Sequence, residues 1–252
     1  MTTFSVRLVF HGDLPFFLRS KKPAIERQLQ ERTSVKDIIE ACGVPHSEVD
    51  FILVDDQPVN FSRVVGCKSQ IDVFPVDSKR ITPFSENRLQ VTEISKFGAD
   101  GHLGKLVRDL RLLGIDVVYD RDADDRELIE TSGSQNRALL TRDRRLLMHS
   151  AVRHGYYVRS QNSLEQTVEV LRRFNLGPVL TPFSRCLRCN AQLKQAKKRE
   201  IIGQLEPLTK IYYDEFRQCL RCGQIYWAGS HFGKLQKRIE TIQSRLTDQH
   251  SA

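Results

Sequence analysis

The sequence changes from a strand pattern to a helix pattern within Phe97-Gly98-Ala99-Asp100-Gly101-His102-Leu103-Gly104-Lys105-Leu106. Residues 94–99 have the pattern of a short strand that ends at Asp100. Apolar residues then recur at the helical positions 103, 106, 107, 110 and 113, and Gly114 supplies a stop. A strand followed at once by an amphipathic helix is the building unit of α/β folds, which this stretch therefore predicts.

Strand and helix patterns continue to alternate downstream. Three more short strands are predicted at 117–119, 138–140 and 156–158, with a helix around Leu128 and a closing helix from 163 to 174. Such alternation favours a parallel sheet with right-handed crossovers. We therefore expect an α/β parallel-sheet domain.

Acidic residues follow the strands of this predicted domain. Asp100 follows the first strand and Asp143 the third, and after the second strand comes a cluster of Asp120, Asp122, Asp124, Asp125 and Glu127. The carboxyl ends of parallel strands open on one crevice, so these side chains should converge there. Carboxylate oxygens are ligands for hard cations such as Mg²⁺ or Mn²⁺. A cation held in this way supports phosphodiester hydrolysis, which is nuclease chemistry.

Each acid also has a purely structural explanation. An aspartate at a helix start commonly caps the helix, which applies to Asp100, Asp124 and Asp125. Asp143 is flanked by three arginines and could be an ion-pair partner. The combination of acids at strand ends is more specific than any single member.

Three segments of this region resemble the Mut7-C RNase domain, a branch of the PIN-like nucleases. They are residues 97–114, 124–128 and 139–143, within a resemblance that covers about residues 93–232. The resemblance implies a PIN-like fold and metal-dependent RNA cleavage. It places Asp100, Asp125 and Asp143 at the catalytic positions, as ligands of Mg²⁺ or Mn²⁺.

The family pattern also separates Asp125 from its neighbour Asp124, which is a further catalytic candidate. The family places its acid three residues before an apolar helix residue, here Leu128. PIN nucleases often carry a fourth acid near the end of the third strand, where this chain has Arg144 and Arg145.

Basic side chains near the acids are candidates for binding RNA phosphates. Lys105, Arg108 and Arg111 are expected opposite the apolar face of the helix after Asp100, and Arg142, Arg144 and Arg145 flank the predicted crevice. An ordinary solvated helix face explains the first three equally well.

Two C-x-x-C pairs lie near the C-terminal end, Cys186-Leu187-Arg188-Cys189 and Cys219-Leu220-Arg221-Cys222, with 29 residues between them. Four thiolates at this spacing predict one structural Zn²⁺ in a closed tetrahedral shell with no catalytic position. A redox role for each pair is the alternative. We expect the insert to fold back as a hairpin that contains Ile201-Ile202 and Ile211-Tyr212-Tyr213.

Arginines and aromatic residues are interleaved around the cysteines. They are Arg185, Arg188, Arg217 and Arg221, with Tyr212, Tyr213, Phe216, Tyr226 and Trp227. Basic groups can hold an RNA backbone while rings stack on unpaired bases, so we expect single-stranded RNA to bind here. Half of these rings could instead form the ribbon's core. His231 matches the family pattern, and residues 234–246 have the apolar spacing of an amphipathic helix.

The N-terminal residues have a different pattern. A strand at 4–10, an apolar stretch at 14–18 that can pair with it, a helix between Ser34 and Gly43, and strands at 51–54 and 71–74 predict an α+β fold. The order resembles the β-grasp fold of ubiquitin-like sulfur carriers. These carriers end in Gly-Gly, which this segment lacks, so carrier chemistry is not expected. We expect a packing or docking domain with a possible protein partner.

Positive charge is concentrated in the last segment. Residues 1–90, 91–180 and 181–252 carry net charges of 0, +1 and +7, out of a total of +8. A basic module beside an acid-bearing one suggests that one part holds a polyanion on which the other acts. A solvated basic tail is the simpler alternative.

We predict a ubiquitin-like β-grasp domain at 1–80, a linker at 78–92, a PIN-like domain at 93–180, a zinc ribbon at 181–232 and a C-terminal helix or tail at 233–252. No apolar run approaches the roughly 18 residues of a membrane span, and the first residues lack a secretory signal. We expect a cytoplasmic protein without membrane contact. The predicted function is a metal-dependent ribonuclease; the alternative is a noncatalytic RNA- or ribosome-binding adaptor that keeps the fold.

Overall fold

The computed structural model describes residues 3–76, 85–91 and 93–248, so the predicted linker at 78–92 lies partly outside the described residues. The chain separates into two compact units. Unit 1 contains residues 1–94 and 123–158, and unit 2 contains residues 95–122 and 159–252. Among the described helices, none is both long and apolar enough for a membrane span.

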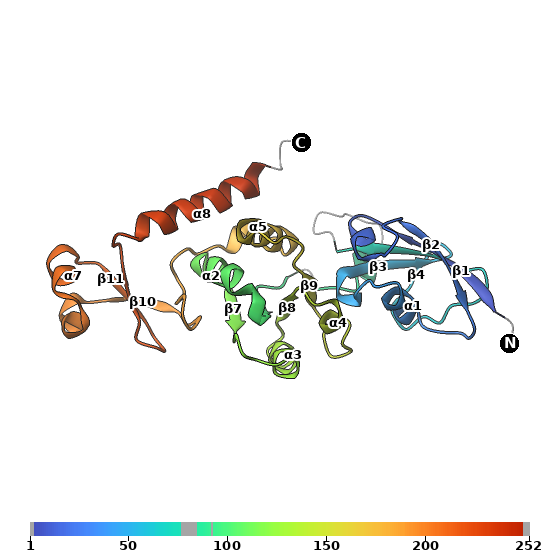
Figure 1. The fold of residues 1–252 in the computed structure, drawn as a ribbon, viewed down its shortest axis with the longest axis horizontal. Coiled ribbons are helices and arrows are strands. Elements are labelled where there is room, and N and C mark those ends of the chain that lie inside the picture. The colour runs from blue at the N-terminus through green and yellow to red at the C-terminus, as the bar shows by residue number, and fades with distance from the viewer. Residues whose placement is uncertain (1–2, 77–84, 92, 249–252) are drawn as a thin grey trace. The chain divides into compact units, whose positions relative to one another are not determined.

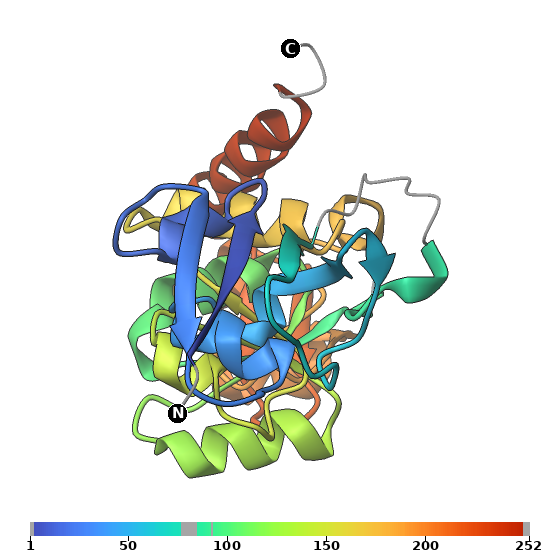
Figure 2. The same ribbon diagram turned by 90° about the vertical axis from the view of Figure 1, so that its right-hand side faces the viewer.

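Unit 1 begins with a five-stranded sheet of order β2-β1-β5-β3-β4 (Figure 1). The strands are β1 (Phe4–Phe10), β2 (Ala24–Leu29), β3 (Val49–Val54), β4 (Gln57–Pro58) and β5 (Gln70–Pro75). The central pair β1 and β5 is parallel, and the other neighbours are antiparallel. Figure 2 shows β1 and β2 in front of helix α1 (Val35–Ala41), the α+β arrangement expected of a ubiquitin-like domain.

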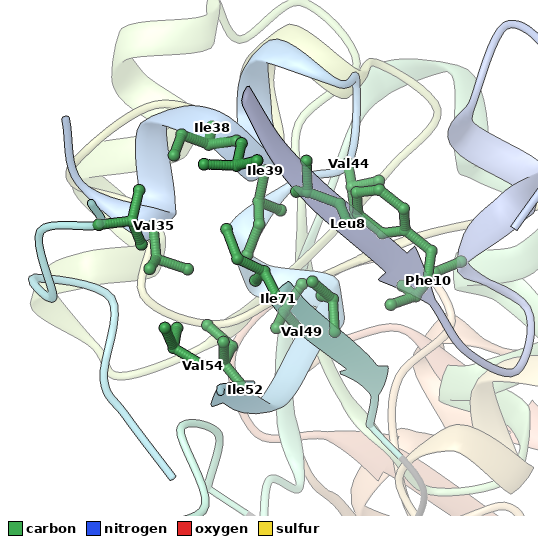
Figure 3. Close-up of a cluster of buried hydrophobic side chains, with 14 of the residues drawn as sticks. Leu8, Phe10, Val35, Ile38, Ile39, Val44, Val49, Ile52, Val54 and Ile71 are labelled. Atoms are coloured by element: carbon green, nitrogen blue, oxygen red, sulfur yellow. The ribbon is translucent and has the colours of Figure 1, made fainter. Parts of the chain in front are cut away.

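Helix α1 packs its apolar face onto this sheet (Figure 3). Ser34 caps the helix by accepting a hydrogen bond from Asp37 N, and the helix then presents Val35, Ile38 and Ile39, all buried. Alternate residues of the strands, such as Leu8 and Phe10 of β1, point into the same core. The two periodicities, 3.6 in the helix and 2 in the strand, therefore define one shared core.

The predicted pairing of residues 14–18 with β1 is wrong. Residues Leu14–Phe17 form a short 3₁₀ helix, and β2 pairs with β1 instead. Pro15 has no backbone N–H to donate to a sheet, and Leu14, Phe17 and Leu18 fill the core from a turn while Phe16 stays exposed. The true partner strand was missed because β2 has no fully buried residue and thus no strong hydrophobic pattern.

The second part of unit 1 contains a parallel strand pair and two helices. Strands β8 (Ala138–Thr141) and β9 (Gly155–Tyr157) are parallel, and helices α3 (Asp125–Ser134) and α4 (Arg144–Leu147) lie on either side of β8 in sequence. A small core joins these elements; it contains Leu128, Leu139, Leu146, Leu147 and Val152.

The ubiquitin-like domain packs against this second part through buried polar groups. His46 is 6% exposed; its Nδ1 lies 2.6 Å from Glu40 Oε1, and its Nε2 lies 2.7 Å from the carbonyl oxygen of Val152. Tyr157 N donates to Glu48 Oε1 at 2.6 Å, and Glu48 is 2% exposed. These bonds satisfy groups that would be costly to bury alone. The N-terminal domain is therefore bound within the chain on this side.

Unit 2 also contains a parallel strand pair. Strands β6 (Lys96–Ala99) and β7 (Asp116–Tyr119) are parallel and joined by a 3₁₀ turn (Gly101–Leu103) and helix α2 (Gly104–Leu112). Helix α5 (Ser163–Arg173) follows later in the chain, where the closing helix was predicted, and is capped by Asn162. The parallel strands expected from the alternating pattern are thus present in both units.

The cysteine-bearing segment forms an antiparallel sheet of β10 (Leu193–Ala196), β11 (Phe216–Cys219) and β12 (Ile225–Trp227). The expected hairpin exists, but it consists of β10 and β11. The residues predicted to be in the hairpin lie in helices α6 (Lys198–Ile201) and α7 (Pro207–Tyr212) and near them. Ile201 and Leu205 are buried against Phe216, a helical packing that the short apolar runs did not reveal.

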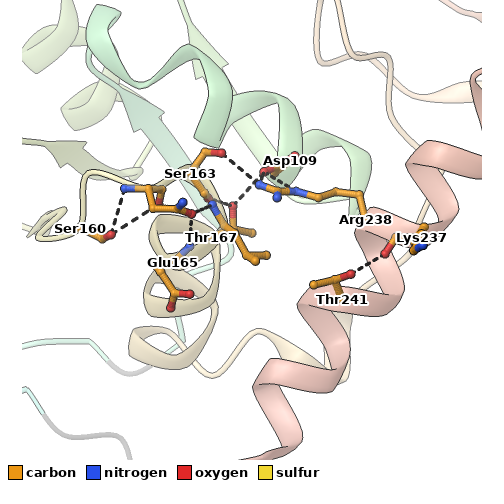
Figure 4. Close-up of polar contacts among 10 residues, drawn as sticks. Asp109, Ser160, Ser163, Glu165, Thr167, Lys237, Arg238 and Thr241 are labelled. Atoms are coloured by element: carbon orange, nitrogen blue, oxygen red, sulfur yellow. Dashed lines mark hydrogen bonds and ion pairs between the residues drawn. The ribbon is translucent and has the colours of Figure 1, made fainter.

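Helix α8 (Phe232–Thr247) follows the ribbon and confirms the predicted amphipathic helix. Arg238 of α8 bonds to Asp109 of α2 and to Ser163 of α5 (Figure 4). Its Nε donates to Asp109 Oδ2 at 3.2 Å, and Thr167 Oγ1 donates to the same oxygen at 3.4 Å. Asp109 is 8% exposed, and these hydrogen bonds offset the free-energy cost of burying its carboxylate.

We expect Arg238→Ala to lower the free energy of unfolding by about 2 kcal/mol. This is less than the about 3–5 kcal/mol for breaking a fully buried pair, because the Arg238 side chain is 29% exposed. Urea denaturation followed by circular dichroism measures the change. The matched control is Arg245→Ala, whose partner Glu165 is exposed, so its loss costs at most about 1 kcal/mol. Equal effects of both variants would contradict the prediction.

Candidate functional site

The four cysteines of the two C-x-x-C pairs meet at one point in unit 2. Their Sγ atoms all lie within 4.8 Å of one another. The Sγ atoms of Cys186 and Cys222 are 3.6 Å apart, and those of Cys189 and Cys219 are 3.3 Å apart. A tetrahedral ion with Zn–S bonds of about 2.3 Å separates its sulfurs by about 3.8 Å. The spacing fits one zinc ion.

Each pair of cysteines lies in a tight turn that ends in a left-handed residue. Asn190 N donates to Cys186 O at 3.0 Å, and Gly223 N donates to Cys219 O at 3.2 Å. The residues after the pairs, Asn190 and Gly223, have φ angles of 69° and 72°. Glycine and asparagine adopt this conformation most readily, so the sequence after each C-x-x-C specifies the turn.

Hydrogen bonds to sulfur favour the thiolate form of Cys186 and Cys219, whereas burial raises the pKa of the Cys189 thiol to about 12 and the pKa of Cys222 is also raised. Burial alone would raise the pKa of the Cys219 thiol, but N–H donors from Cys222 and Arg221, both 3.4 Å from Sγ, help to bring that pKa down to about 6. The hydroxyl of Tyr226 lies 3.1 Å from Cys186 Sγ, and burial raises the tyrosine's pKa so that it stays protonated and donates. Thiolates are the form that binds a metal.

Arg111 holds the first cysteine turn by hydrogen bonds to its backbone, a role that the sequence did not predict. It is only 4% exposed, and its Nη1 donates to the carbonyl oxygens of Leu187 and Arg188, each at 3.1 Å. Its Nε and Nη2 donate to Val117 O at 3.1 and 2.9 Å. Burial lowers its pKa. The expectation of an exposed phosphate-binding Arg111 is wrong, because the ribbon covers this end of α2.

Asn190 connects the ribbon to β7. Its side chain accepts a hydrogen bond from Val117 N at 3.1 Å and donates to Asp116 Oδ1 at 2.8 Å. Arg185 adds a bond from Nε to Gly114 O at 3.1 Å. These contacts hold the cysteine cluster in a defined position on the α/β part of unit 2.

The four predicted catalytic aspartates lie at helix starts, whereas Asp120 and Asp122 lie between β7 and α3. Asp143 caps α4, where its Oδ1 accepts from Arg145 N at 2.7 Å and from Leu146 N at 3.4 Å. Asp124 caps α3 in a reciprocal capping box with Glu127. Asp100 caps the 3₁₀ turn after β6 by accepting from His102 N at 3.3 Å. The capping explanation therefore applies to these three aspartates.

Capping leaves ligand capacity on three of the acids. Within the described part of the chain, Oδ2 of Asp143, Oδ2 of Asp124 and both side-chain oxygens of Asp125 accept no hydrogen bond, and all three side chains are exposed. The four cysteines are the one group of metal-capable side chains that lie close enough together to share an ion among the described residues. A shared cation at Asp100, Asp125 and Asp143 remains a prediction.

The predicted phosphate-binding residues lie in different surroundings. Lys105 and Arg108 are exposed on α2, and Arg142 is half-buried just before Asp143. Arg144 instead packs on the ubiquitin-like domain: its Nη1 donates to Phe17 O at 2.9 Å, and its guanidinium carbon lies 5.6 Å from the Phe17 ring and 5.9 Å from the Tyr157 ring. Arg144, which directly follows the helix cap Asp143, is thus bonded to the N-terminal domain.

We expect Arg144→Ala to destabilise the protein by about 2 kcal/mol, through loss of a charged hydrogen bond and of cation–π contacts. A drop in the denaturation midpoint measures it. Arg145→Ala is the matched control, since Arg145 is an exposed neighbour of equal charge; that variant should change stability by no more than about 0.5 kcal/mol. If the Arg144 variant were as stable as the Arg145 variant, the contacts of Arg144 with the N-terminal domain would not stabilise the protein.

A ubiquitin-like domain, strand–helix units with parallel strands and a four-cysteine ribbon, whose sulfur atoms lie close enough together to share a metal ion, define a multidomain α/β protein. Comparison with protein-family models shows which families the two parts of the chain match. The Mut7-C RNAse domain matches residues 95–239, and the Mut7-C ubiquitin domain matches residues 3–80. The chain belongs to the Mut7-C RNAse domain family, which indicates a ribonuclease type of function. Among curated proteins, none matches it significantly.

Proposed function

We propose that this protein is a metal-dependent ribonuclease that hydrolyses RNA phosphodiester bonds at Asp100, Asp125 and Asp143. The observation that carries the proposal is the match of residues 95–239 to the Mut7-C RNAse domain, a range that contains all three aspartates. Carboxylate oxygens suit Mg²⁺ or Mn²⁺. When bound, such an ion would lower the pKa of a water molecule and neutralise charge that develops on the phosphate.

The caps support this assignment through orientation. A carboxylate that accepts two backbone N–H bonds through one oxygen is held in a fixed direction, and its second oxygen is available to a ligand, as in Asp143. Asp124 caps α3 through Oδ1, whereas Asp125 follows at the first helical position, three residues before the apolar Leu128. The family pattern places its acid three residues before an apolar helix residue, so we assign the catalytic role to Asp125 and a positioning role to Asp124.

Basic residues complete the proposed site. Lys105, Arg108 and Arg142 are available to hold and orient RNA phosphates. The cysteine cluster would bind structural Zn²⁺ and keep the basic, aromatic ribbon folded, so that the ribbon binds single-stranded RNA. A cytoplasmic location and a protein partner for the ubiquitin-like domain remain predictions.

The test is incubation of end-labelled single-stranded RNA with the full-length protein and Mn²⁺. We expect cleavage that EDTA stops and that added Mn²⁺ restores. The pattern of fragments separates internal cleavage from cleavage at an end.

A noncatalytic RNA-binding or ribosome-binding adaptor is the second candidate. One observation favours it: three of the four candidate acids act as helix caps, a role that would preserve them without catalysis. Intact RNA that is nevertheless retained by the protein would support the adaptor and overturn the ribonuclease.

A further inference from the structure

Unit 2 contains a cavity of about 690 Å³ between the zinc ribbon and the start of α8. Strands β11 and β12 form one wall with Phe216, Arg217 and Trp227. Phe183 and Phe232 also line the cavity, and their rings stack with centroids 4.9 Å apart and an interplanar angle of 26°. The volume lies within the range of about 300–1,000 Å³ that is typical of small-ligand sites.

Trp227 is a large aromatic side chain of this cavity that remains accessible to a ligand. It is 39% exposed although its neighbours Phe216 and Ile225 are buried. Its indole N–H makes no hydrogen bond to any described residue, so it can donate to a ligand. A Cβ at Gly229 would lie 2.7 Å from Trp227 Nε1, which shows that the glycine makes room for the indole in this position.

The polar lining offers both donors and acceptors at the edge of the aromatic walls. Gln195, Glu215, Gln224 and His231 line the cavity together with Arg185 and Arg217. Nucleobases present flat aromatic faces and mixed donor–acceptor edges, a combination that this lining matches. The segment 181–252, with 13 basic and 6 acidic residues, is complementary to the phosphates that accompany each base.

We propose that this cavity binds an unpaired nucleobase of single-stranded RNA, stacked on Trp227, while Arg217 and the surrounding basic residues hold the adjoining phosphates. The proposal rests on RNA being the ligand of the proposed function, and it adds the place and mode of binding. This mode of binding requires an unpaired base, because a base inside a duplex is stacked on its neighbours and has no face available to Trp227.

Trp227 is the single tryptophan of the sequence and therefore reports on its own site. The experiment uses the zinc-loaded full chain carrying Asp143→Asn, so that RNA stays intact. We expect a short single-stranded RNA to quench tryptophan fluorescence saturably, and the same strand in a duplex or with abasic sites to quench it far less. Equal quenching by the abasic strand, or no quenching at RNA concentrations that saturate binding, would overturn the proposal.

Affinity measured by fluorescence anisotropy of labelled RNA gives the second readout. Trp227→Leu should weaken binding about 10-fold, the size of one lost base-stacking contact, and Trp227→Phe should restore part of it. Leu208→Ala is the control, since Leu208 belongs to the same segment, is 67% exposed and lies outside the cavity lining. Unchanged zinc content shows that each variant is folded. Equal affinities of the Trp227→Leu and Leu208→Ala variants would refute the site.

These measurements separate the two proposals. Saturable quenching without any cleavage by the wild-type protein keeps the nucleobase site and removes the ribonuclease. Cleavage with no effect at Trp227 keeps the ribonuclease and removes the nucleobase site. RNA binding that is independent of Trp227 would leave the cavity to a different class of ligand, such as a peptide, and overturn the proposal.

Discussion

We expect Asp143→Asn to abolish RNA cleavage while the protein remains folded. Asparagine caps a helix about as well as aspartate, so the bonds from Arg145 N and Leu146 N to the side chain are kept. The substitution removes the negative charge and the available carboxylate oxygen. We expect a rate loss of at least about 100-fold, the effect of removing one charge-stabilising group from an active site. The measurement is the initial rate of cleavage with saturating Mn²⁺.

The same substitution at two other positions tests whether the effect is specific. Asp124→Asn is the matched control, because Asp124 is also a helix cap but lies one residue before the position that the family pattern gives to the acid. We expect Asp125→Asn and Asp100→Asn to lose activity as Asp143→Asn does, and Asp124→Asn to keep most of it. Wild-type rates in the Asp143 variant would refute the proposed site. An equal loss at Asp124 and Asp125 would refute the choice between them.

Cys219→Ser should remove zinc and unfold the ribbon. We expect the zinc content to fall from about one ion per chain to nearly none, and the segment between the cysteine pairs to become sensitive to protease. Zinc binding supplies about 10–16 kcal/mol in small zinc modules, far more than the few buried side chains of this small core can supply. Elemental analysis and limited proteolysis measure both effects.

The control for this variant is Cys67→Ser. Cys67 is an exposed thiol outside the cluster, so its loss should leave zinc content and protease resistance unchanged. Full zinc content in Cys219→Ser would show that the metal site lies elsewhere. If Cys219→Ser also weakened RNA binding, the ribbon's role in binding would gain direct support, independently of cleavage.

Local sequence signals located most elements correctly. Helix α1 follows from the Ser34 cap and three spaced apolar residues, and α2 ends where Gly114 has a φ of 90°. The signals failed where a segment depends on distant partners. Apolar residues 14–18 form a turn that fills a core, and residues 201–213 lie in and around helices packed on Phe216. In both cases a short apolar run was compatible with strand or helix, and burial against other segments decided between them.

The sequence by itself determined the cysteine centre and the helix caps. A C-x-x-C pair followed by asparagine or glycine specifies its own turn, and an aspartate at a helix start finds its backbone partners within three residues. Tertiary structure alone decided the surroundings of the arginines: Arg111 is buried beneath the ribbon, Arg144 is bonded to the ubiquitin-like domain, and Arg238 is paired with Asp109. Their partners lie tens of residues away, so no local pattern distinguishes these arginines from the solvated ones.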